Sequence, residues 1–263
     1  MYTFSMATSE RMVYATQPSP LRHQINALLE QEPTERIDGE VLGVVVPGTN
    51  RIRGGRVAAS VYATLRGRAY DTVILVAPSH TGPFSRMNIC SVDSYRTPLG
   101  DLRVNDAVRN ELCDEDDDIY LDDQGHYHTE GIDVQLPYLQ TVLDEFDIVP
   151  IIMGDESPEY CRELGAAIGE VMYNRKTLLV STADILEASD EALSQFQQAF
   201  NERDVSALMG LLNSERLRIE GKGPLLVALI AALHRRATHA RILRREAPEN
   251  GSPGFVGAVL YRQ

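Results

Sequence analysis

The side chain with the clearest chemical potential is His80, which ends the segment Pro78-Ser79-His80. This segment follows the β-branched run Thr72 to Ala77, a pattern typical of a strand that is buried on both faces of a sheet. An imidazole held at the end of such a strand can act as a metal ligand or as a general acid or base. A single histidine is more often structural, so both roles stay open for His80 at this point.

Two other loops follow apolar runs of the same kind. Val41 to Val46 leads into the glycine-rich loop 48–55, whose backbone amides and two arginines could hold an anion at a helix start. Its spacing matches neither a Walker A motif nor a dinucleotide fingerprint, so a simple connection is the alternative. Thr177 to Thr182 leads to Asp184, which could be a site carboxylate or a helix N-cap.

A third candidate group is His126-Tyr127-His128 followed by Glu130 and Asp133. On a strand, the two histidines would point to the same side, and the two carboxylates would share one face of a helix. Two imidazoles and a carboxylate are suitable ligands for zinc or iron. The alternative is a chance cluster in an acidic loop.

Strand-like and helix-like segments alternate along the chain, which indicates an α/β fold. We find no Pro/Ser-rich linker and no fixed-period repeat, so residues 1–263 are expected to form a single domain with a largely buried central sheet flanked by helices. In such sheets, ligands bind outside the carboxyl ends of the strands. We expect strands at 41–46, 72–77, 88–92, 148–153, 177–182, 241–245 and 254–261, and helices at 20–32, 56–65, 104–112, 131–143, 158–173, 189–212 and 223–235.

Composition limits the partners and the compartment. The formal net charge of −13 argues against nucleic acid or an anionic membrane as the main partner. The three cysteines have no CxxC spacing, and the odd count fits a reducing compartment. We find no signal-peptide pattern at the start and no stretch near the ~18 apolar residues of a membrane helix, so a cytoplasmic protein is expected.

Several segments, in order along nearly the whole chain, resemble the Memo family. The most specific is Tyr95-Arg96-Thr97-Pro98-Leu99-Gly100-Asp101, which composition would not produce by chance. The others are 14–29, the Val45-Val46-Pro47 strand end with Gly54-Gly55 and Val57-Ala58-Ala59, Pro78-Ser79-His80, 92–102, 131–138, 148–154, 180–184 and 221–224.

The resemblance carries expectations about fold and chemistry. The Memo family includes the protein B component of the AmmeMemoRadiSam gene group, and its fold is similar to that of class III extradiol ring-cleaving dioxygenases, which hold non-haem iron. It implies copper or iron binding with redox chemistry, and phosphotyrosine-peptide binding in the animal members. A protein partner from the same gene group is a further expectation.

The chain departs from the family pattern at its metal-site histidines. Gly48, Thr49 and Asn50 stand where the family has His-Ala-Gly, and Glu130 and Asp133 replace a His and a Glu. Glu187 stands at a third histidine position. His80 and Asp184 match the pattern, Gln135 is an allowed variant, and the usual two-His-one-carboxylate set cannot be completed from matched positions. His126 and His128 could substitute only if their loop folds back.

We therefore expect a Memo-like protein with a degenerate metal pocket, which binds a small molecule or peptide or acts as an accessory protein, without stoichiometric copper or iron. The alternative is a metal-dependent oxygenase or hydrolase with a rebuilt site, for which Mn²⁺, Mg²⁺ or non-haem iron are the candidate ions. The candidate catalytic residues are His80 and Asp184, the candidate metal ligands are His80, Glu130 and Asp184, and the candidate pocket residues are Gly48, Thr49, Asn50, Asp133, Gln135 and Arg96. For Arg96 two roles are open, a structural partner of Asp101 or an anion clamp.

Overall fold

The computed structural model describes residues 3–5, 14–32, 35–49, 52–113, 118–127, 130–214, 216–249 and 251–263. Its helices are α1 (Pro18–Gln31), α2 (Ile52–Tyr62), α3 (Asp106–Leu112), α4 (Glu130–Asp133), α5 (Leu136–Val142), α6 (Pro158–Val171), α7 (Asp190–Glu202), α8 (Val205–Leu212) and α9 (Lys222–His234). Its strands are β1 (Thr3–Ser5), β2 (Glu40–Val46), β3 (Thr72–Pro78), β4 (Met87–Ile89), β5 (Ser94–Thr97), β6 (Gly100–Arg103), β7 (Ile119–Leu121), β8 (Asp147–Met153), β9 (Thr177–Thr182), β10 (Asp184–Ala188), β11 (Leu217–Glu220), β12 (His239–Glu246) and β13 (Gly254–Arg262).

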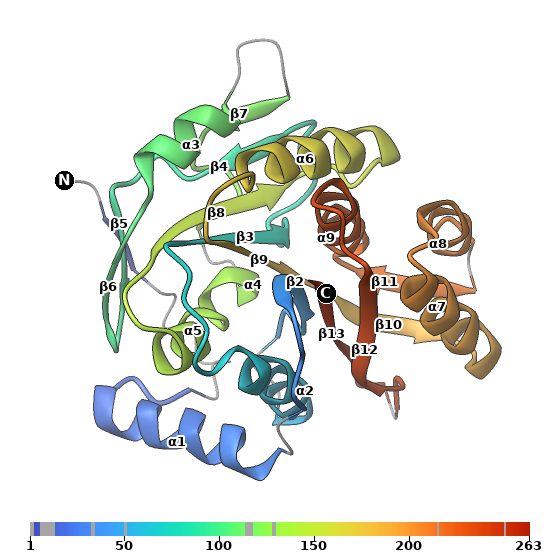
Figure 1. The fold of residues 1–263 in the computed structure, drawn as a ribbon, viewed down its shortest axis with the longest axis horizontal. Helices are drawn as coiled ribbons and strands as arrows, with labels where there is room; N and C mark the ends of the chain where they lie inside the picture. The colour runs from blue at the N-terminus through green and yellow to red at the C-terminus, as the bar shows by residue number, and fades with distance from the viewer. Residues whose placement is uncertain are drawn as a thin grey trace.

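A large mixed sheet organises the described residues. Its strand order is β11-β10-β13-β2-β9-β3-β8-β4-β7, with β12 paired to β13. The central strands β2, β9, β3 and β8 are parallel, so their carboxyl ends meet at one edge. Helices cover both faces, with α1, α2, α4 and α5 on one side and α3, α6 and α9 on the other (Figure 1). The expected α/β domain with a central sheet between helices is confirmed.

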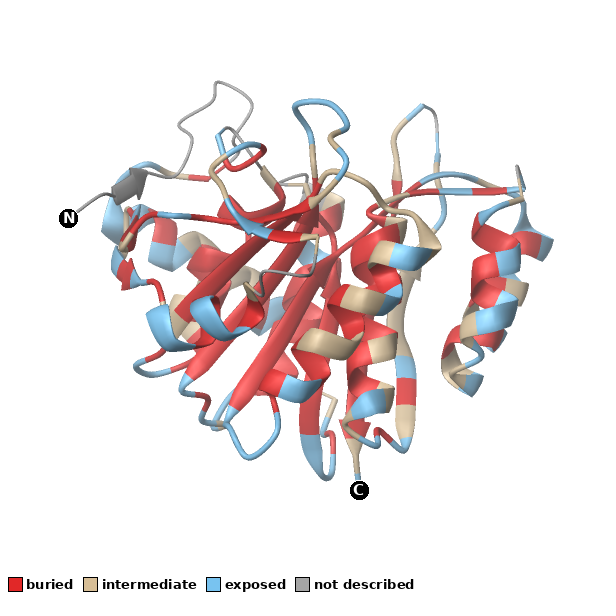
Figure 2. Cartoon of the chain, turned by 90° about the horizontal axis from the view of Figure 1, so that it is seen from above, coloured by how far each residue is buried: buried red, intermediate tan, exposed pale blue. Residues whose placement is uncertain are grey.

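The apolar runs produce a core on each face of the sheet. Every residue of β3 and β9 is buried, as Figure 2 shows for the central strands. Side chains alternate along each strand, so Val44 joins the core beneath α1 and α2 while Val45 joins the core beneath α6 and α9. Two-sided burial explains why these strands read as continuous apolar runs.

The structure differs from the expected elements at several places. The single helix expected at 131–143 is split into α4 and α5, because Pro137 cannot donate a hydrogen bond back to the carbonyl of Asp133. Asp184 begins β10 and is not a helix N-cap. The pattern gave no sign of β1, β5, β6, β7, β10 or β11. None of the helices within the described ranges is long and apolar enough to cross a membrane.

A second, three-stranded sheet of β1, β5 and β6 lies beside the large one. It contains the hairpin of the Tyr95–Asp101 motif. The turn is closed by Thr97, whose hydroxyl donates to Gly100 O at 2.8 Å and accepts from Leu99 N at 3.1 Å. Gly100 adopts a φ of +132°, which favours glycine at this corner.

Candidate functional site

Three of the loops singled out from the sequence follow adjacent parallel strands. β9 lies between β2 and β3, and Val46 at the end of β2 is directly opposite Thr182 at the end of β9. The residues that come next, Gly48, Asp184 and His80, therefore extend from the same edge of the sheet.

Gly48 and Asp184 are in direct contact at this edge. The backbone N–H of Gly48 donates to Asp184 Oδ1 at 3.3 Å, and the Asp184 residue is only 2% exposed. A Cβ atom at Gly48 would lie 3.5 Å from Thr182 Oγ1 and 3.6 Å from Asp184 Oδ2, both ordinary contact distances. Position 48 therefore has room for a side chain that points at Thr182 and Asp184.

Gly131, at the start of α4, lies close to both Thr182 and His80. A Cβ atom at Gly131 would lie 3.4 Å from Thr182 Oγ1 and 3.6 Å from His80 Cε1. It would also lie 2.8 Å from Ala77 Cβ, so only glycine fits without a shift of the backbone. We call Gly48, His80, Gly131, Thr182 and Asp184 the Thr182 cluster.

The hydroxyl of Thr182 is the central polar atom of the cluster. Thr182 is 1% exposed, and among the described residues its Oγ1 has no hydrogen-bond partner. Buried hydroxyls are normally paired, because leaving one unpaired costs about 1–3 kcal/mol. Thr182 Oγ1 therefore offers a donor and an acceptor to a group placed between the Gly48 and Gly131 backbones.

Thr49 and Asn50 follow Gly48 in the loop. Thr49 is half-buried, and its hydroxyl is a second buried oxygen that has no partner within the part of the chain that the structure describes. Asn50, also expected as a pocket residue, lies outside the described residues.

Two carboxylates near the cluster were not assigned to the site from the sequence. Glu220 Oε1 lies 3.9 Å from His80 Nε2. Glu156 accepts a hydrogen bond from Gly223 N at 2.5 Å at the start of α9, and burial raises the pKa of its carboxyl, opposed by that bond and by Lys222. Glu220 directly precedes the segment 221–224, which entered only through the family resemblance. Glu156 lies three residues after β8, and this strand-end position could have indicated it.

Gln135 and Asp133, the other expected pocket residues, make hydrogen bonds within the protein. The amide nitrogen of Gln135 donates to Pro47 O at 2.9 Å and to Gly131 O at 3.1 Å, while its oxygen accepts from the hydroxyl of Tyr62. Gln135 therefore holds the end of β2 against α4. Asp133 is 1% exposed and accepts a 2.6 Å hydrogen bond from Tyr95, so it links α4 to the small sheet.

The residues at the family's histidine positions lie on three separate elements: the loop after β2, the start of α4, and β10. Among the described residues, no three His, Cys, Asp or Glu side chains are grouped so that they could hold a metal ion. Glu187 is largely exposed and pairs with Arg218 at 2.6 Å across β10 and β11. Glu130 is half-buried at the start of α4. The expected absence of stoichiometric copper or iron, and the assignment of His80, Glu130 and Asp184 as metal ligands, stay predictions.

His126 is engaged elsewhere in the fold. Its ring is buried, with Nε2 2.9 Å from Asn88 O on β4. Burial lowers the pKa of His126 to about 4, against an ordinary value of 6.5. His128, the other possible replacement ligand, lies outside the described residues.

The buried ring of His126 predicts a loss of stability in mild acid. The unfolded chain, in which the pKa is near 6.5, binds more protons than the folded chain between pH 6.5 and 4. The contribution of the neutral His126 ring to the free energy of unfolding is fully present above pH 6.5, and it falls by about 3 kcal/mol as the pH drops to 4. Urea unfolding across this range should be less pH-dependent in His126→Gln, whose amide can still donate to Asn88 O. Parallel pH profiles for the two proteins would contradict this.

Arg96 forms the expected ion pair with Asp101, at 3.2 Å across the β5–β6 hairpin. The two side chains are 62% and 53% exposed, so the pair lies in solvent. A pair this exposed is worth at most about 1 kcal/mol. This ion pair lies on the small sheet, away from the Thr182 cluster.

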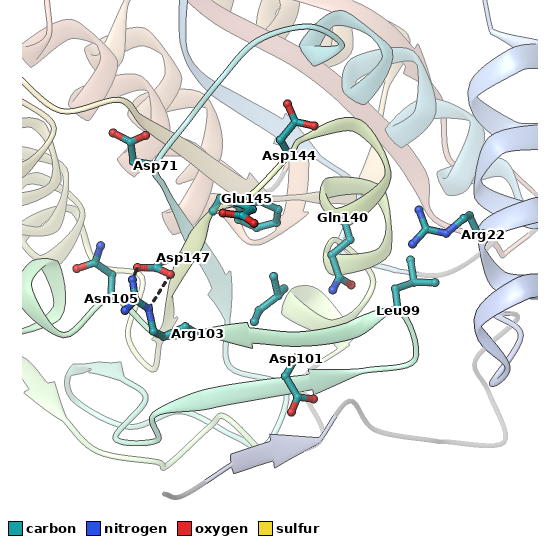
Figure 3. Close-up of a pocket in the computed structure, with 12 residues that line it drawn as sticks. Arg22, Asp71, Leu99, Asp101, Arg103, Asn105, Gln140, Asp144, Glu145 and Asp147 are labelled. Carbon is teal, nitrogen blue, oxygen red and sulfur yellow. Dashed lines mark hydrogen bonds and ion pairs between the residues drawn. The ribbon is translucent and has the colours of Figure 1, made fainter.

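A cavity of about 670 Å³ lies next to this hairpin, at the amino ends of β3 and β8 (Figure 3). Arg103 makes a bidentate pair with Asp147 in its wall, with N–O distances of 3.0 and 2.7 Å. Asp71, Asp101, Asp144 and Glu145 add further carboxylates. This cavity is at the opposite end of the parallel strands from His80.

The fold and the edge at which the cluster lies define an α/β protein with its candidate site at the carboxyl ends of parallel strands. The model of the Memo-like protein family matches residues 7–250, and the chain belongs to this family. A MEMO1 family protein of Saccharolobus solfataricus is 30% identical over 257 residues, covering 90% of this chain and 89% of that protein.

Other comparisons agree with this family. A MEMO1 family protein of Methanosarcina barkeri is 30% identical, covering 88% of this chain and 87% of its own. Among solved structures, an uncharacterized Escherichia coli K12 protein, JW3007, superposes with a TM-score of 0.58 at 14% identity, covering 84% of this chain and 99% of that one. This last likeness concerns the fold alone.

Proposed function

We propose that this Memo family member is a binding or accessory protein whose family metal pocket is degenerate and takes a small polar molecule or a peptide group. The observation that carries the proposal is the buried hydroxyl of Thr182, which lacks a partner among the described residues and faces the Gly48 and Gly131 backbones. A ligand carbonyl or hydroxyl would satisfy Thr182 Oγ1, with Asp184 and His80 beside it.

Two features of the chain support binding over redox catalysis. Glycine and glutamate stand where the family pattern has imidazoles, and the donors within the described ranges are not grouped for a metal ion. The alternative is an oxygenase or hydrolase built on His80, Glu130 and Asp184 with iron, Mn²⁺ or Mg²⁺. A protein partner from the same gene group, a cytoplasmic location, no nucleic-acid or membrane partner, and a single domain over 1–263 stay predictions.

Metal analysis and a ligand screen test the proposal together. The purified chain, incubated with Fe(II), Cu(II) or Mn(II) and then desalted, should retain well under one ion per chain by mass spectrometry. Small carboxylic acids, amides and short peptides should shift the amide signals of Gly48 and Gly131 in ¹H–¹⁵N spectra.

The matched control is Thr182→Val, which keeps the shape of the side chain and removes the hydroxyl. It should abolish those shifts while leaving the rest of the spectrum in place. One tightly bound iron, copper or manganese per wild-type chain would overturn the proposal and favour the enzyme. If the ligand-induced shifts are the same in Thr182→Val, the binding site does not include the Thr182 hydroxyl and lies elsewhere on the protein.

A further inference from the structure

A separate cavity, of about 460 Å³, lies at the amino ends of the parallel strands, away from the Thr182 cluster. It is formed where α6 and α9 end and where β13, which runs antiparallel to β2, also ends. Three arginines line it: Arg235 and Arg236 directly after α9, and Arg262 at the end of β13. Glu170 is the acidic residue in its lining.

The charge of this cavity is opposite to that of the whole chain. The sequence has 38 acidic against 25 basic residues, so carboxylate partners for arginine are in excess. Arg262 uses one, pairing with Glu40 at 2.5 Å. For Arg235 and Arg236, however, no carboxylate oxygen of a described residue lies within ion-pair distance. Arg235 and Arg236 thus line one cavity without an ion pair to a described residue, and a bound anion would supply the opposite charge.

The guanidinium of Arg235 is held in a fixed orientation. Its Cζ lies 4.7 Å from the centroid of the Tyr173 ring, a cation–π contact that holds the group over the ring. The Nε atom of Arg235 is buried and has no hydrogen-bond partner within the described part of the chain. Arg262 Nη1 donates to Arg235 O at 3.5 Å, which brings the third guanidinium to the same wall. The donors of Arg235 are therefore positioned before any ligand arrives.

Arg236 occupies a backbone conformation that favours glycine. Its φ is +60°, in the left-handed region where a non-glycine residue costs about 1–2 kcal/mol. A glycine at this helix end would remove that cost. The side chain is therefore not needed for the local fold, and its removal gives a variant that separates folding from binding.

From these observations we propose that Arg235, Arg236 and Arg262 form a binding site for a phosphate-bearing small molecule. Guanidinium groups donate in pairs to phosphate oxygens, and several of them around one cavity favour a doubly charged group over a single carboxylate. The volume admits a phosphate with an organic substituent or a diphosphate. This site is independent of the function proposed for the Thr182 cluster.

The test is a thermal-shift titration of the full chain with inorganic phosphate and with pyrophosphate, against sodium chloride at matched ionic strength. A saturable rise in melting temperature is expected with both phosphates, because a ligand that binds only the folded state stabilises it. Arg236→Gly should weaken pyrophosphate binding roughly tenfold or more, the loss of one charge-assisted contact.

Arg203→Gly is the matched control. Arg203 also ends a helix with positive φ, at +61°, and its loss removes the same charge from a place outside the cavity. It should bind phosphate like the wild type, and so should Thr182→Val. The proposal fails if phosphate adds nothing beyond chloride, if acetate gives the same saturable rise, or if Arg236→Gly and Arg203→Gly respond alike.

Discussion

The double variant Gly48→His, Glu130→His is expected to bind one Fe(II) or Cu(II) per chain on the order of ten-thousandfold more tightly than the wild type. Each change restores an imidazole at a family histidine position: Gly48 contacts Asp184, and Glu130 directly precedes Gly131 of the Thr182 cluster. Four-ligand sites bind with about 10–16 kcal/mol in total, or roughly 3 kcal/mol per ligand, and 1.4 kcal/mol is tenfold in affinity. Titration calorimetry and metal content after gel filtration measure the gain.

The local geometry permits the change at position 48. A Cβ there would make ordinary contacts of 3.4–3.6 Å with Thr182 and Asp184, so the first atom of a side chain can be added without displacing the backbone. Gly210→His is the matched control, because a Cβ at Gly210 meets no described atom within 4 Å. Equal metal affinity in the double variant and in this control would show that position 48 does not face a potential metal site.

The fold was largely predictable because its central strands are buried on both faces. The runs at 41–46, 72–77 and 177–182 became β2, β3 and β9 with almost the expected bounds, since nearly every residue in them must be apolar. The short strands β10 and β11 were missed. In β10 two buried residues precede the exposed Leu186 and Glu187, and in β11 the exposed Arg218 lies between two buried residues, so four or five residues carry too little signal.

The candidate site was predictable only as far as strand order allows. Gly48, His80 and Asp184 each follow a strand of the parallel set, and the carboxyl ends of such strands share an edge. The role of the Thr182 hydroxyl could not be predicted from the sequence, because it depends on two glycines, Gly48 and Gly131, that leave space on either side of it. The same pattern that indicated Asp133 gave no hint that it turns toward Tyr95.

Gly221 lies next to the Thr182 cluster, at a position where the backbone leaves no space for a side chain. We expect Gly221→Ala to lower the free energy of unfolding by about 3 kcal/mol or more. Its φ of +79° disfavours any Cβ by about 1–2 kcal/mol. A Cβ would also lie 2.2 Å from Thr182 O and 3.2 Å from Thr182 C. These are backbone atoms at the end of β9, so relief requires moving β9 or the start of α9, a strain of about 1–3 kcal/mol. Urea unfolding measures the loss.

Two other glycines separate the causes. Gly67 has a φ of +76° but no atom within 4 Å of the added Cβ, so Gly67→Ala should show the conformational cost alone. Gly210, within α8, has neither feature, and Gly210→Ala should stabilise the helix by about 0.5–1 kcal/mol. If Gly221→Ala lowers the free energy of unfolding no more than Gly67→Ala does, then the start of α9 can shift away from Thr182 at little cost. If the larger cost is found, the backbone beneath the Thr182 cluster is rigid, because Gly221 allows α9 to begin against the last residue of β9.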